Sequence, residues 1–151
     1  MTSIPSLSES VDQSVLCWLA TVSADGQPNV SPKELFVLHD SDELVIANVA
    51  SPQSARNVAV NPQVCVSFID VFVQKGQQVK GKARLITEDA PDFNIYASPL
   101  QQLAGDRYPF NSVFVIKIEK IKPIIAPSYL LYPATTEADQ IASAKRAYGV
   151  G

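Results

Sequence analysis

The sequence of 151 residues has few of the side chains on which metal sites and hydrolases depend. It contains one histidine and two cysteines, and the cysteines are far from a CxxC spacing. Because zinc sites need several imidazole or thiolate ligands close together, no metal site is expected. The single histidine, His39, lies in the polar stretch LHDSDE, and no GxSxG motif is present. A Ser-His-Asp hydrolase is therefore not expected, and His39 is interpreted as a turn residue.

Nucleotide-binding glycine loops, long hydrophobic runs and an excess of positive charge are missing as well. No Walker or GxGxxG motif is present, which argues against P-loop and Rossmann chemistry. The longest apolar runs fall far short of the roughly 20 residues that span a bilayer, and MTSIPSLSESVDQ lacks the basic start of a secretory signal. The net charge of -3 gives no overall attraction to nucleic acid or anionic lipid. We expect a cytoplasmic protein that binds neither nucleic acid nor a membrane.

The residues that are present indicate one mostly β domain over residues 1–151. The hydrophobic fraction is 46% and the charged fraction 18%, as is typical of a globular chain. Asp25-Gly26 joins two apolar-alternating runs and predicts a β-hairpin, whose second strand is expected to continue through Pro32 to Val37. Further strands are expected at 43–50, 63–73, 78–87 and 112–126, with turns at 39–43 and 74–78. Helices are expected within 1–14, at 52–60, in pieces broken by Pro99 between 88 and 106, and near the end of a C-terminal extension, 123–151.

About six antiparallel strands with peripheral helices predict a closed or split β-barrel. Gly81 and Pro32 are expected at the bulges or edges that such curvature needs. Strand 63–73 is expected to be buried on both faces, and strand 112–126 to be half-exposed. Cys17 and Cys65 are predicted to be buried free thiols, as in a reducing compartment. Trp18 is interpreted as a core residue, with a stacking platform as the alternative.

The stretch ANVASPQSARNVAVNP, residues 47–62, is the strongest candidate for a binding site. Ser51 is a natural N-cap and Pro52 a natural first helical residue, and Asn61-Pro62 ends the predicted helix. A helix start offers free N–H groups to an anion, and Arg56 and Lys33 can add positive charge. Ser31, Asn48, Ser51 and Ser54 supply neutral hydrogen-bonding groups. The pattern predicts a phosphate or carboxylate site, and the alternative is a capped surface helix with a solvated arginine.

A second group of basic side chains alternates along strand 78–87. Lys80, Lys82 and Arg84 share one face of this strand, opposite the apolar side chains of the other face. This pattern is typical of the solvent-exposed face of an antiparallel strand. The alternative is that one of these side chains, or Gln78 before them, reaches a ligand across the barrel.

Three stretches, in this order, carry a resemblance to a known family: LATVSADGQPNVSPKELFV, LVIANVASPQSARNVAVNPQVCVSFID and GQQVKGKARLI. They resemble the pyridoxamine 5'-phosphate oxidase-like family of FMN-binding split barrels, over residues 10–122. The family's order is a DGxPxV hairpin, a strand ending before a helix with serine, arginine and a closing NP, a buried strand, and a VxGxA strand. The resemblance implies a split barrel that binds FMN at a homodimer interface.

The resemblance also implies which residues contact the flavin. The strand residues from Asn29 to Lys33 match the strand that lines the flavin, and Ala47 to Val49 match the segment beside the isoalloxazine ring. Ser51, Arg56 and Asn57 match phosphate-binding positions. Gln78 lies near a ring-contacting position that often comes from the partner subunit, and Lys80 is grouped with it. The implied FMN-binding residues are Asn29, Val30, Ser31, Pro32, Lys33, Ala47, Asn48, Val49, Ser51, Arg56, Asn57, Gln78 and Lys80.

The C-terminal extension 123–151 departs from the family. Pyridoxamine-phosphate oxidases end in a segment rich in Trp and Arg that binds the substrate, whereas PIIAPSYLLYPATTEADQIASAKRAYGVG has no Trp and no matching Arg pair. Oxidation of pyridoxamine phosphate is therefore not expected. Tyr129, Tyr132 and the terminal helix are expected to brace the dimer, with covering of the cavity mouth as the alternative.

The function that the resemblance implies is FMN-dependent hydride or electron transfer on an unknown small molecule. No side chain in the sequence is an evident acid–base catalyst. One alternative is a flavin-binding or stress-related protein without turnover. Another is the same barrel with haem or a deazaflavin. His39 in its polar turn is a poor axial ligand for haem, and a deazaflavin would favour a more basic chain.

Overall fold

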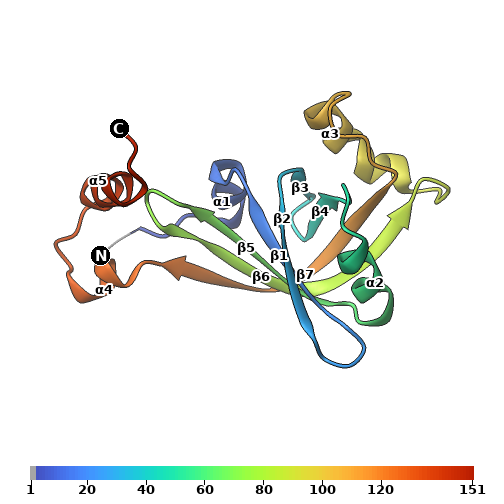
Figure 1. The fold of residues 1–151 in the computed structure, drawn as a ribbon, viewed down its shortest axis with the longest axis horizontal. Helices are drawn as coiled ribbons and strands as arrows, with labels where there is room; N and C mark the ends of the chain where they lie inside the picture. Colours follow the sequence, from blue (N-terminus) through green and yellow to red (C-terminus); the bar gives the residue numbers. More distant parts are fainter. Residues whose placement is uncertain (1–2) are drawn as a thin grey trace.

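The computed structural model describes residues 3–151, which form seven strands and five helices (Figure 1). Every strand pair is antiparallel, and the strands form one sheet in the order β2-β1-β5-β6-β7-β4-β3. No helix in this part of the chain is long and apolar enough to span a bilayer. In chain order the elements are α1 (Leu7–Gln13), β1 (Cys17–Val22), β2 (Pro28–Lys33), β3 (Phe36–His39), β4 (Glu43–Ala47), α2 (Pro52–Val60), β5 (Gln63–Asp70), β6 (Lys75–Thr87), α3 (Phe93–Ala104), β7 (Ser112–Ile125), α4 (Pro127–Leu131) and α5 (Glu137–Tyr148).

The sheet is curled into a split barrel. β2 and β3 are its two edge strands, yet only Glu34 and Leu35 separate them in the chain. Three Cα–Cα steps span at most about 11 Å, so the two edges must come close together at this point. Leu35 also accepts a hydrogen bond from the Ala47 amide of β4 at 3.0 Å, which continues the pairing of β3 with β4 into the linker. The predicted split β-barrel is confirmed, with seven strands in place of about six.

Two apolar clusters hold the fold together. One fills the barrel interior and includes Leu19, Phe68 and Phe114. The other lies between α3 and the β4–β7 part of the sheet and includes Leu100 and Val113. Because both faces of the sheet are covered here, the start of β7 is buried on both sides, while its second half, from Lys117 onward, is largely exposed.

Several elements differ from their predictions because of this tertiary arrangement. The long strand expected through Pro32 to Val37 is broken into β2 and β3, because the chain crosses there from one sheet edge to the other. The strand expected at 63–73 has one buried and one half-buried face, and strand 112–126 is half-exposed only in its second half. α3 continues through Pro99, and Ile95, whose carbonyl Pro99 cannot bond, lies at the solvent face.

The turn between β5 and β6 begins earlier than the predicted turn at 74–78. The Asp70 carboxylate accepts hydrogen bonds from the amides of Phe72 and Val73, at 2.9 and 3.1 Å, as Asx turns do. Gly76, which suggested a turn, lies inside β6 where a Cβ would come 1.8 Å from the Phe68 carbonyl oxygen. This glycine is needed for a close approach of two strands and not for a turn.

The bulge predicted at Gly81 is confirmed by a register shift between Lys80 and Gly81 where β6 pairs with β7. A Cβ at Gly81 would lie 2.1 Å from the Lys117 carbonyl oxygen, so the bulge brings the two backbones close together. Pro32 lies on the edge strand β2, where its lack of an N–H group costs no sheet hydrogen bond.

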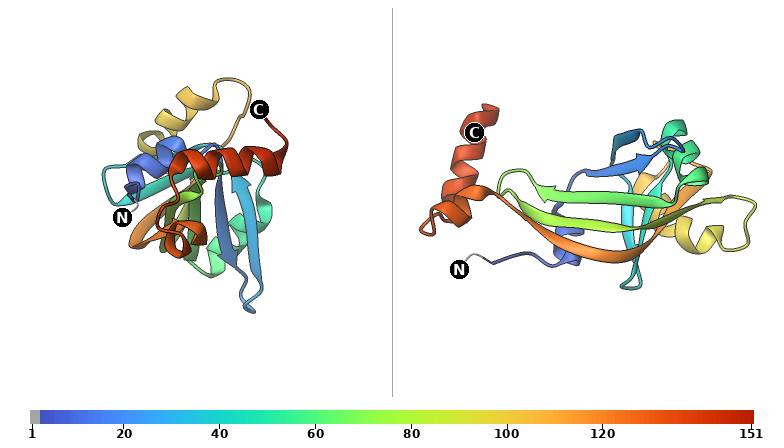
Figure 2. Two further views of the ribbon diagram at one scale, coloured as in Figure 1. Left: turned by 90° about the vertical axis from the view of Figure 1, so that its left-hand side faces the viewer. Right: turned by 90° about the horizontal axis from the view of Figure 1, so that it is seen from below.

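The two ends of the chain pack differently: α1 lies against the barrel, where Val11 joins the interior cluster, whereas α4 and α5 lie at one end of the molecule. The helix expected within 1–14 is α1, which starts with a Ser6–Glu9 capping box; residues 1 and 2 of that segment lie outside the described residues. α5 begins with a Thr136–Asp139 capping box and ends at Gly149 in the left-handed region. Figures 1 and 2 show α4 and α5 at the tip of the β5–β6 hairpin, at the opposite end of the molecule from α2.

Candidate functional site

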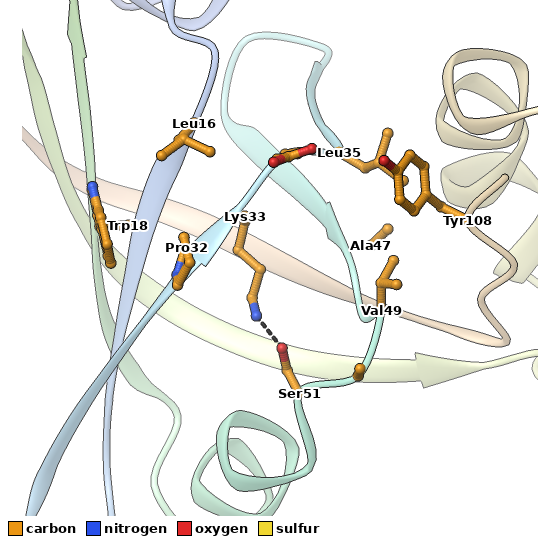
Figure 3. A pocket seen from close by; sticks show the side chains of 11 residues that line it. Leu16, Trp18, Pro32, Lys33, Leu35, Ala47, Val49, Ser51 and Tyr108 are labelled. Atoms are coloured by element: carbon orange, nitrogen blue, oxygen red, sulfur yellow. Dashed lines mark hydrogen bonds between the residues drawn. The ribbon is translucent and has the colours of Figure 1, made fainter. Parts of the chain in front are cut away.

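A mostly apolar cavity of about 430 Å³ lies where β2, β4 and the start of α2 meet (Figure 3). Its volume lies within the range of small-molecule sites, and a small number of polar groups among apolar walls is their usual pattern. Three segments distant in sequence supply the walls: the β1–β2 region, the chain from β4 to α2, and the loop after α3. The lining residues are Leu16, Trp18, Pro32, Lys33, Glu34, Leu35, Ala47, Val49, Ala50, Ser51 and Tyr108.

Lys33 is the buried cation of this cavity. It is the last residue of β2 and is 6% exposed, and its Nζ donates a hydrogen bond to the Ser51 hydroxyl. Among residues 3–151, no carboxylate lies within 4.0 Å of this Nζ. Burial lowers the pKa of Lys33 because desolvation disfavours the charged form. An ammonium group has three donors, so a protonated Lys33 has donors beyond the one bonded to Ser51 that an anion in the cavity can accept.

The segment between β4 and α2 places Ser51 opposite Lys33. Asn48 holds this segment: its side-chain amide donates to the Ser112 hydroxyl at 3.0 Å and accepts from the Ser51 amide at 3.2 Å. Ala50 has a φ of 68°, which is uncommon for a residue other than glycine. Ser51 occupies the predicted N-cap position, but its hydroxyl accepts from Lys33 and makes no capping hydrogen bond.

The structure brings only part of the sequence-predicted set to this cavity. Pro32, Lys33, Ala47, Val49 and Ser51 line it. Asn48 lies directly behind the lining through the hydrogen bonds described above. Ser31 lies next to the lining residue Pro32, and its hydroxyl is 3.2 Å from that of Ser54 at the start of α2. Of the residues that the resemblance assigns to the flavin, those at the end of β2 and in the β4–α2 connection therefore lie at or next to the cavity.

The other predicted residues lie elsewhere. Arg56 is exposed and donates to the Gln53 side chain at 2.8 Å, on the solvent side of α2. Asn57 is buried and donates to the Thr21 hydroxyl at 2.9 Å, so it fastens α2 to β1. The remaining residues, which are also outside the lining, are Asn29 and Val30 on the β1–β2 hairpin and Gln78 and Lys80 on β6.

Trp18 and Tyr108 are lining residues that the sequence did not identify as such. Trp18 is 43% exposed, so its assignment to the core is wrong. In β1 the buried positions are Cys17, Leu19 and Thr21, and the alternation places Trp18 on the opposite face, beside Pro32. This alternation of buried and exposed positions along β1 could have been predicted from the sequence. Tyr108 lies in the loop after α3, and no sequence pattern connects that loop with β2.

The buried thiol of Cys17, which lies beside Lys33, is not suited to nucleophilic catalysis. Cys17 pairs with Lys33 across β1 and β2 and is fully buried, and burial raises its pKa to about 12. A thiol with such a pKa stays protonated near neutral pH and is a poor nucleophile. The cavity therefore offers mostly apolar walls, two aromatic side chains, one buried cation and the exposed side chain of Glu34. This arrangement fits a flat molecule with an apolar body and an anionic group.

Solved structures with the same fold bind more than one kind of ligand. HupZ of group A Streptococcus has 27% identity, with 76% of this chain and 88% of that chain covered and a TM-score of 0.65. An FMN-binding protein of Syntrophomonas wolfei has 14% identity, with 80% and 84% covered and a TM-score of 0.66. HutZ, the heme storage protein of Vibrio cholerae, has 22% identity, with 78% and 89% covered and a TM-score of 0.63. The last two likenesses show the shared fold alone.

The sequence itself matches one family model over most of its length. No curated protein is significantly similar to the chain. The model of the pyridoxamine 5'-phosphate oxidase family matches residues 5–138, which include all seven strands of the barrel and the cavity. From this match and the split-barrel fold it follows that the chain belongs to the pyridoxamine 5'-phosphate oxidase family.

Proposed function

We propose that this protein binds FMN in the cavity beside Lys33 and serves as a flavin-dependent oxidoreductase. The observation that carries the proposal is a buried lysine at the wall of a mostly apolar slot, with no carboxylate of the described residues within 4.0 Å of its Nζ. A flavin has a flat ring that suits the slot and an anionic phosphate that would neutralise the lysine. When bound, FMN would supply the redox chemistry, and the protein would supply the slot, the charge and the orientation.

The residues divide into two parts for this ligand. Trp18, Pro32 and Val49 offer apolar surface to the ring, while Lys33 and Ser51 offer donors to an anionic group. Arg56, on the solvent side of α2, would have to leave Gln53 and turn toward the cavity to reach a phosphate. We therefore assign the main electrostatic contribution to Lys33, and the contribution of Arg56 to FMN affinity stays a prediction.

We also propose that the protein is a homodimer. Apolar side chains lie exposed beside the cavity: Val15 is 83% exposed and Val71 44%, and Trp18 is shared between the cavity and this surface. Contiguous exposed apolar surface is unfavourable for an isolated monomer. A second copy would cover it and close the open side of the cavity. Sedimentation equilibrium should give twice the chain mass of 16.3 kDa, and a monomer with full FMN affinity would contradict this part of the proposal.

The test of FMN binding is a fluorescence titration of the ligand-free protein. Wild type should bind saturably with one FMN per chain. Lys33→Gln should bind at least about tenfold more weakly, because a charge-assisted hydrogen bond contributes about 1.5–3 kcal/mol. Arg146→Gln removes an exposed cation on α5 and should leave the affinity unchanged. Equal affinities of wild type and Lys33→Gln would refute the assignment of Lys33.

Three alternatives stay open within the same barrel, namely a flavin carrier without turnover, haem binding and deazaflavin binding. A flavin carrier without turnover would bind FMN but fail to oxidise a reduced nicotinamide donor in the presence of oxygen or a dye. Haem binding has a precedent in the fold of HutZ. His39 lies at the end of β3 with its ring 4.9 Å from that of Tyr96, outside the cavity lining. A Soret band in the purified protein, in place of flavin absorbance, would favour haem.

A further inference from the structure

A groove of about 860 Å³ lies between α1 and β3, the strand at one edge of the sheet. These two elements and the residues next to them form most of its lining, and one residue each of α3 and β7 completes it. We call this space the β3 groove. Its lining includes the apolar side chains of Leu7, Val11, Phe36 and Leu38, which pack in or against the interior cluster of the barrel.

The β3 groove is distinct from the proposed flavin site and from the proposed dimer surface. None of the residues that the resemblance assigns to the flavin lines it. Val15, Trp18 and Val71, the apolar residues that a second copy would cover, lie outside its lining as well. Among the described residues, Glu34 in the linker between β2 and β3 is the one that the groove shares with the cavity beside Lys33.

Part of the β3 backbone is not paired within the chain. Because the Ala47 amide bonds to the Leu35 carbonyl and bonding alternates along an antiparallel pair, the odd-numbered residues of β3 bond to β4. The N–H and C=O groups of Phe36 and Leu38 therefore point away from β4. Among residues 3–151 these groups bond to no other segment. Such a strand edge can pair with an added strand.

The charged side chains of the β3 groove are all acidic. Glu34 precedes β3 and Asp40 follows it, and Asp12 comes from α1. All three side chains are exposed, and no basic side chain of the described residues lines the groove. Within the part of the chain that the structure describes, Asp40 alone of the three has an ion-pair partner, His39 at 3.6 Å. The groove therefore complements a segment with positive charge.

The positions of these carboxylates suit an extended segment. Glu34 and Asp40 bracket β3, and the six residue steps between them span at most about 20 Å. A partner strand of about seven residues has the same length. Alternate side chains of a strand share one face, so such a segment can place apolar side chains against the apolar lining and basic side chains near the two carboxylates.

We propose that the β3 groove binds an extended segment of a partner protein, which adds a strand to the sheet beside β3. Main-chain hydrogen bonds to Phe36 and Leu38 would hold the segment, and apolar side chains on one of its faces would cover the apolar lining. Lysine or arginine at its two ends would pair with Glu34 and Asp40. This proposal does not depend on the proposed FMN binding, because it uses neither the flavin-assigned residues nor a cofactor.

The test uses synthetic peptides with blocked termini, in calorimetric titrations of the full chain. The peptide KVTVTVK has valines on one face and a lysine at each end, and it should bind saturably at one site per chain. EVTVTVE is the matched control with acidic ends, and it should bind at least about fivefold more weakly. Equal affinities of the two peptides would contradict the proposed charge complementarity.

Two N-methylated forms of KVTVTVK distinguish strand addition from attraction between charges alone. The amides of alternate residues point to opposite edges of a strand, so either the valine amides or the threonine amides face β3, and not both. Methylation of the set that faces β3 should abolish saturable binding, whereas methylation of the other set should leave it. Equal affinities of the two methylated peptides would refute the added strand.

Substitutions in the protein test the location of the site. Asp40→Asn and Asp12→Asn should each weaken binding of KVTVTVK about two- to fivefold, as expected for exposed ion pairs. Asparagine tolerates the positive φ of 53° at Asp40, so this substitution removes the charge without straining the backbone. Glu88→Gln, an exposed control after β6, should bind the peptide as wild type does. An equal loss in Glu88→Gln would show that only the overall charge matters.

Two further measurements separate the β3 groove from the flavin site and from the dimer surface. Saturating FMN should leave the affinity for KVTVTVK unchanged, and so should Lys33→Gln. Sedimentation equilibrium should give the same number of chains with and without the peptide. Competition by FMN, or dissociation of the protein by the peptide, would assign the groove to the flavin site or to the dimer surface and overturn the proposal.

Absence of saturable KVTVTVK binding to wild type would overturn the proposal as well. Short edge strands with charged neighbours also occur where a protein avoids pairing with other chains. That result would give the acidic residues around β3 this protective role. It would leave the proposed FMN binding untouched, because the flavin titration and the peptide titration have separate readouts.

Discussion

Two lysines of this protein are buried to nearly the same extent, but their surroundings differ in kind. Lys33 at the end of β2 is 6% exposed, and Lys75 at the start of β6 is 4% exposed. The Nζ of Lys75 lies 2.8 Å from a carboxylate oxygen of Glu137 and 4.5 Å from the ring centroid of Tyr129. The Nζ of Lys33 donates to the hydroxyl of Ser51 and has no carboxylate within 4.0 Å among residues 3–151. A buried charge needs a counter-charge, and among the described residues Lys75 has one whereas Lys33 does not.

The two lysines therefore serve different purposes. Lys75 belongs to the contact that fastens the C-terminal extension to the barrel. In the same contact, Tyr129 donates to the Val73 carbonyl at 2.8 Å, and Gln140 donates to the Gln74 side chain at 2.9 Å. Lys33 lines a cavity instead. Burial alone therefore does not distinguish the two lysines, and it is the missing counter-charge that makes Lys33 the candidate for binding an anionic ligand.

The largest effect is expected when Lys75 is given the surroundings of Lys33. Glu137→Ala removes the counter-charge of Lys75 and should lower the free energy of unfolding by about 2 kcal/mol, less than for a fully buried pair because Glu137 is half-exposed. Tm should fall by about 4–8 °C. Urea unfolding and calorimetry measure both. The free energy of unfolding of the exposed control Glu88→Ala should stay within about 0.5 kcal/mol of wild type. If Glu137→Ala left the free energy of unfolding unchanged, Lys75 would not need its counter-charge, and the difference from Lys33 would disappear.

Much of the fold could be predicted from local signals in the sequence. The Asp25-Gly26 hairpin, the Pro52 start of α2 and the Gly149 end of α5 each depend on a few neighbouring residues, and the structure confirms all three. The bulge at Gly81 was predictable because glycine in an alternating strand marks a close backbone approach. These features are decided by local backbone geometry, which neighbouring residues specify.

The composition of the site could be predicted only in part, because it depends on partners far apart in the chain. Lys33 was identified as a candidate cation, but its isolation from carboxylates is a tertiary property. Arg56 was expected to reach an anion, yet in the structure it donates to Gln53 on the same helix. The counter-charge of Lys75 comes from Glu137, 62 residues later in the chain. Tyr108 enters the lining from the loop after α3.

A smaller effect is expected when Lys33 is given the surroundings of Lys75. Ser51→Asp places a carboxylate where Lys33 now has a hydroxyl. It should stabilise the ligand-free protein by about 1 kcal/mol, because it neutralises the buried cation, and it should weaken binding of an anionic ligand. Urea unfolding gives the first quantity and an FMN titration the second.

Aspartate also caps helices well, so this effect must be separated from pairing with Lys33. A double-mutant cycle does so. In the Lys33→Met background, Ser51→Asp keeps only its capping contribution to the free energy of unfolding. A coupling energy of about 1 kcal/mol between the two sites is expected. A coupling energy of zero would show that Lys33 gains nothing from a counter-charge.

The smallest effect concerns the pH dependence of stability. Burial holds the pKa of Lys33 below its ordinary 10.5. Between the lowered value and 10.5, the unfolded chain keeps a proton that the folded chain has lost, so the free energy of unfolding rises with pH through this window. The Lys33→Met variant lacks this contribution to the free energy of unfolding. The stability of ligand-free wild type relative to Lys33→Met should therefore improve as the pH rises toward 10.5.

Comparing wild type with Lys33→Met also removes an opposing contribution of Cys17 to the pH dependence of stability. Burial raises the pKa of this thiol from 9.0 to about 12, so above pH 9 the folded chain keeps a proton that the unfolded chain loses, and stability falls. Because both proteins contain Cys17, most of this loss cancels in the difference between their free energies of unfolding, and Cys17→Ala in both backgrounds removes the remainder. Urea unfolding from neutral pH upward measures the difference. Parallel curves for wild type and Lys33→Met would show that the fold imposes no cost on the charge of Lys33, and the contrast with Lys75 would then have no energetic basis.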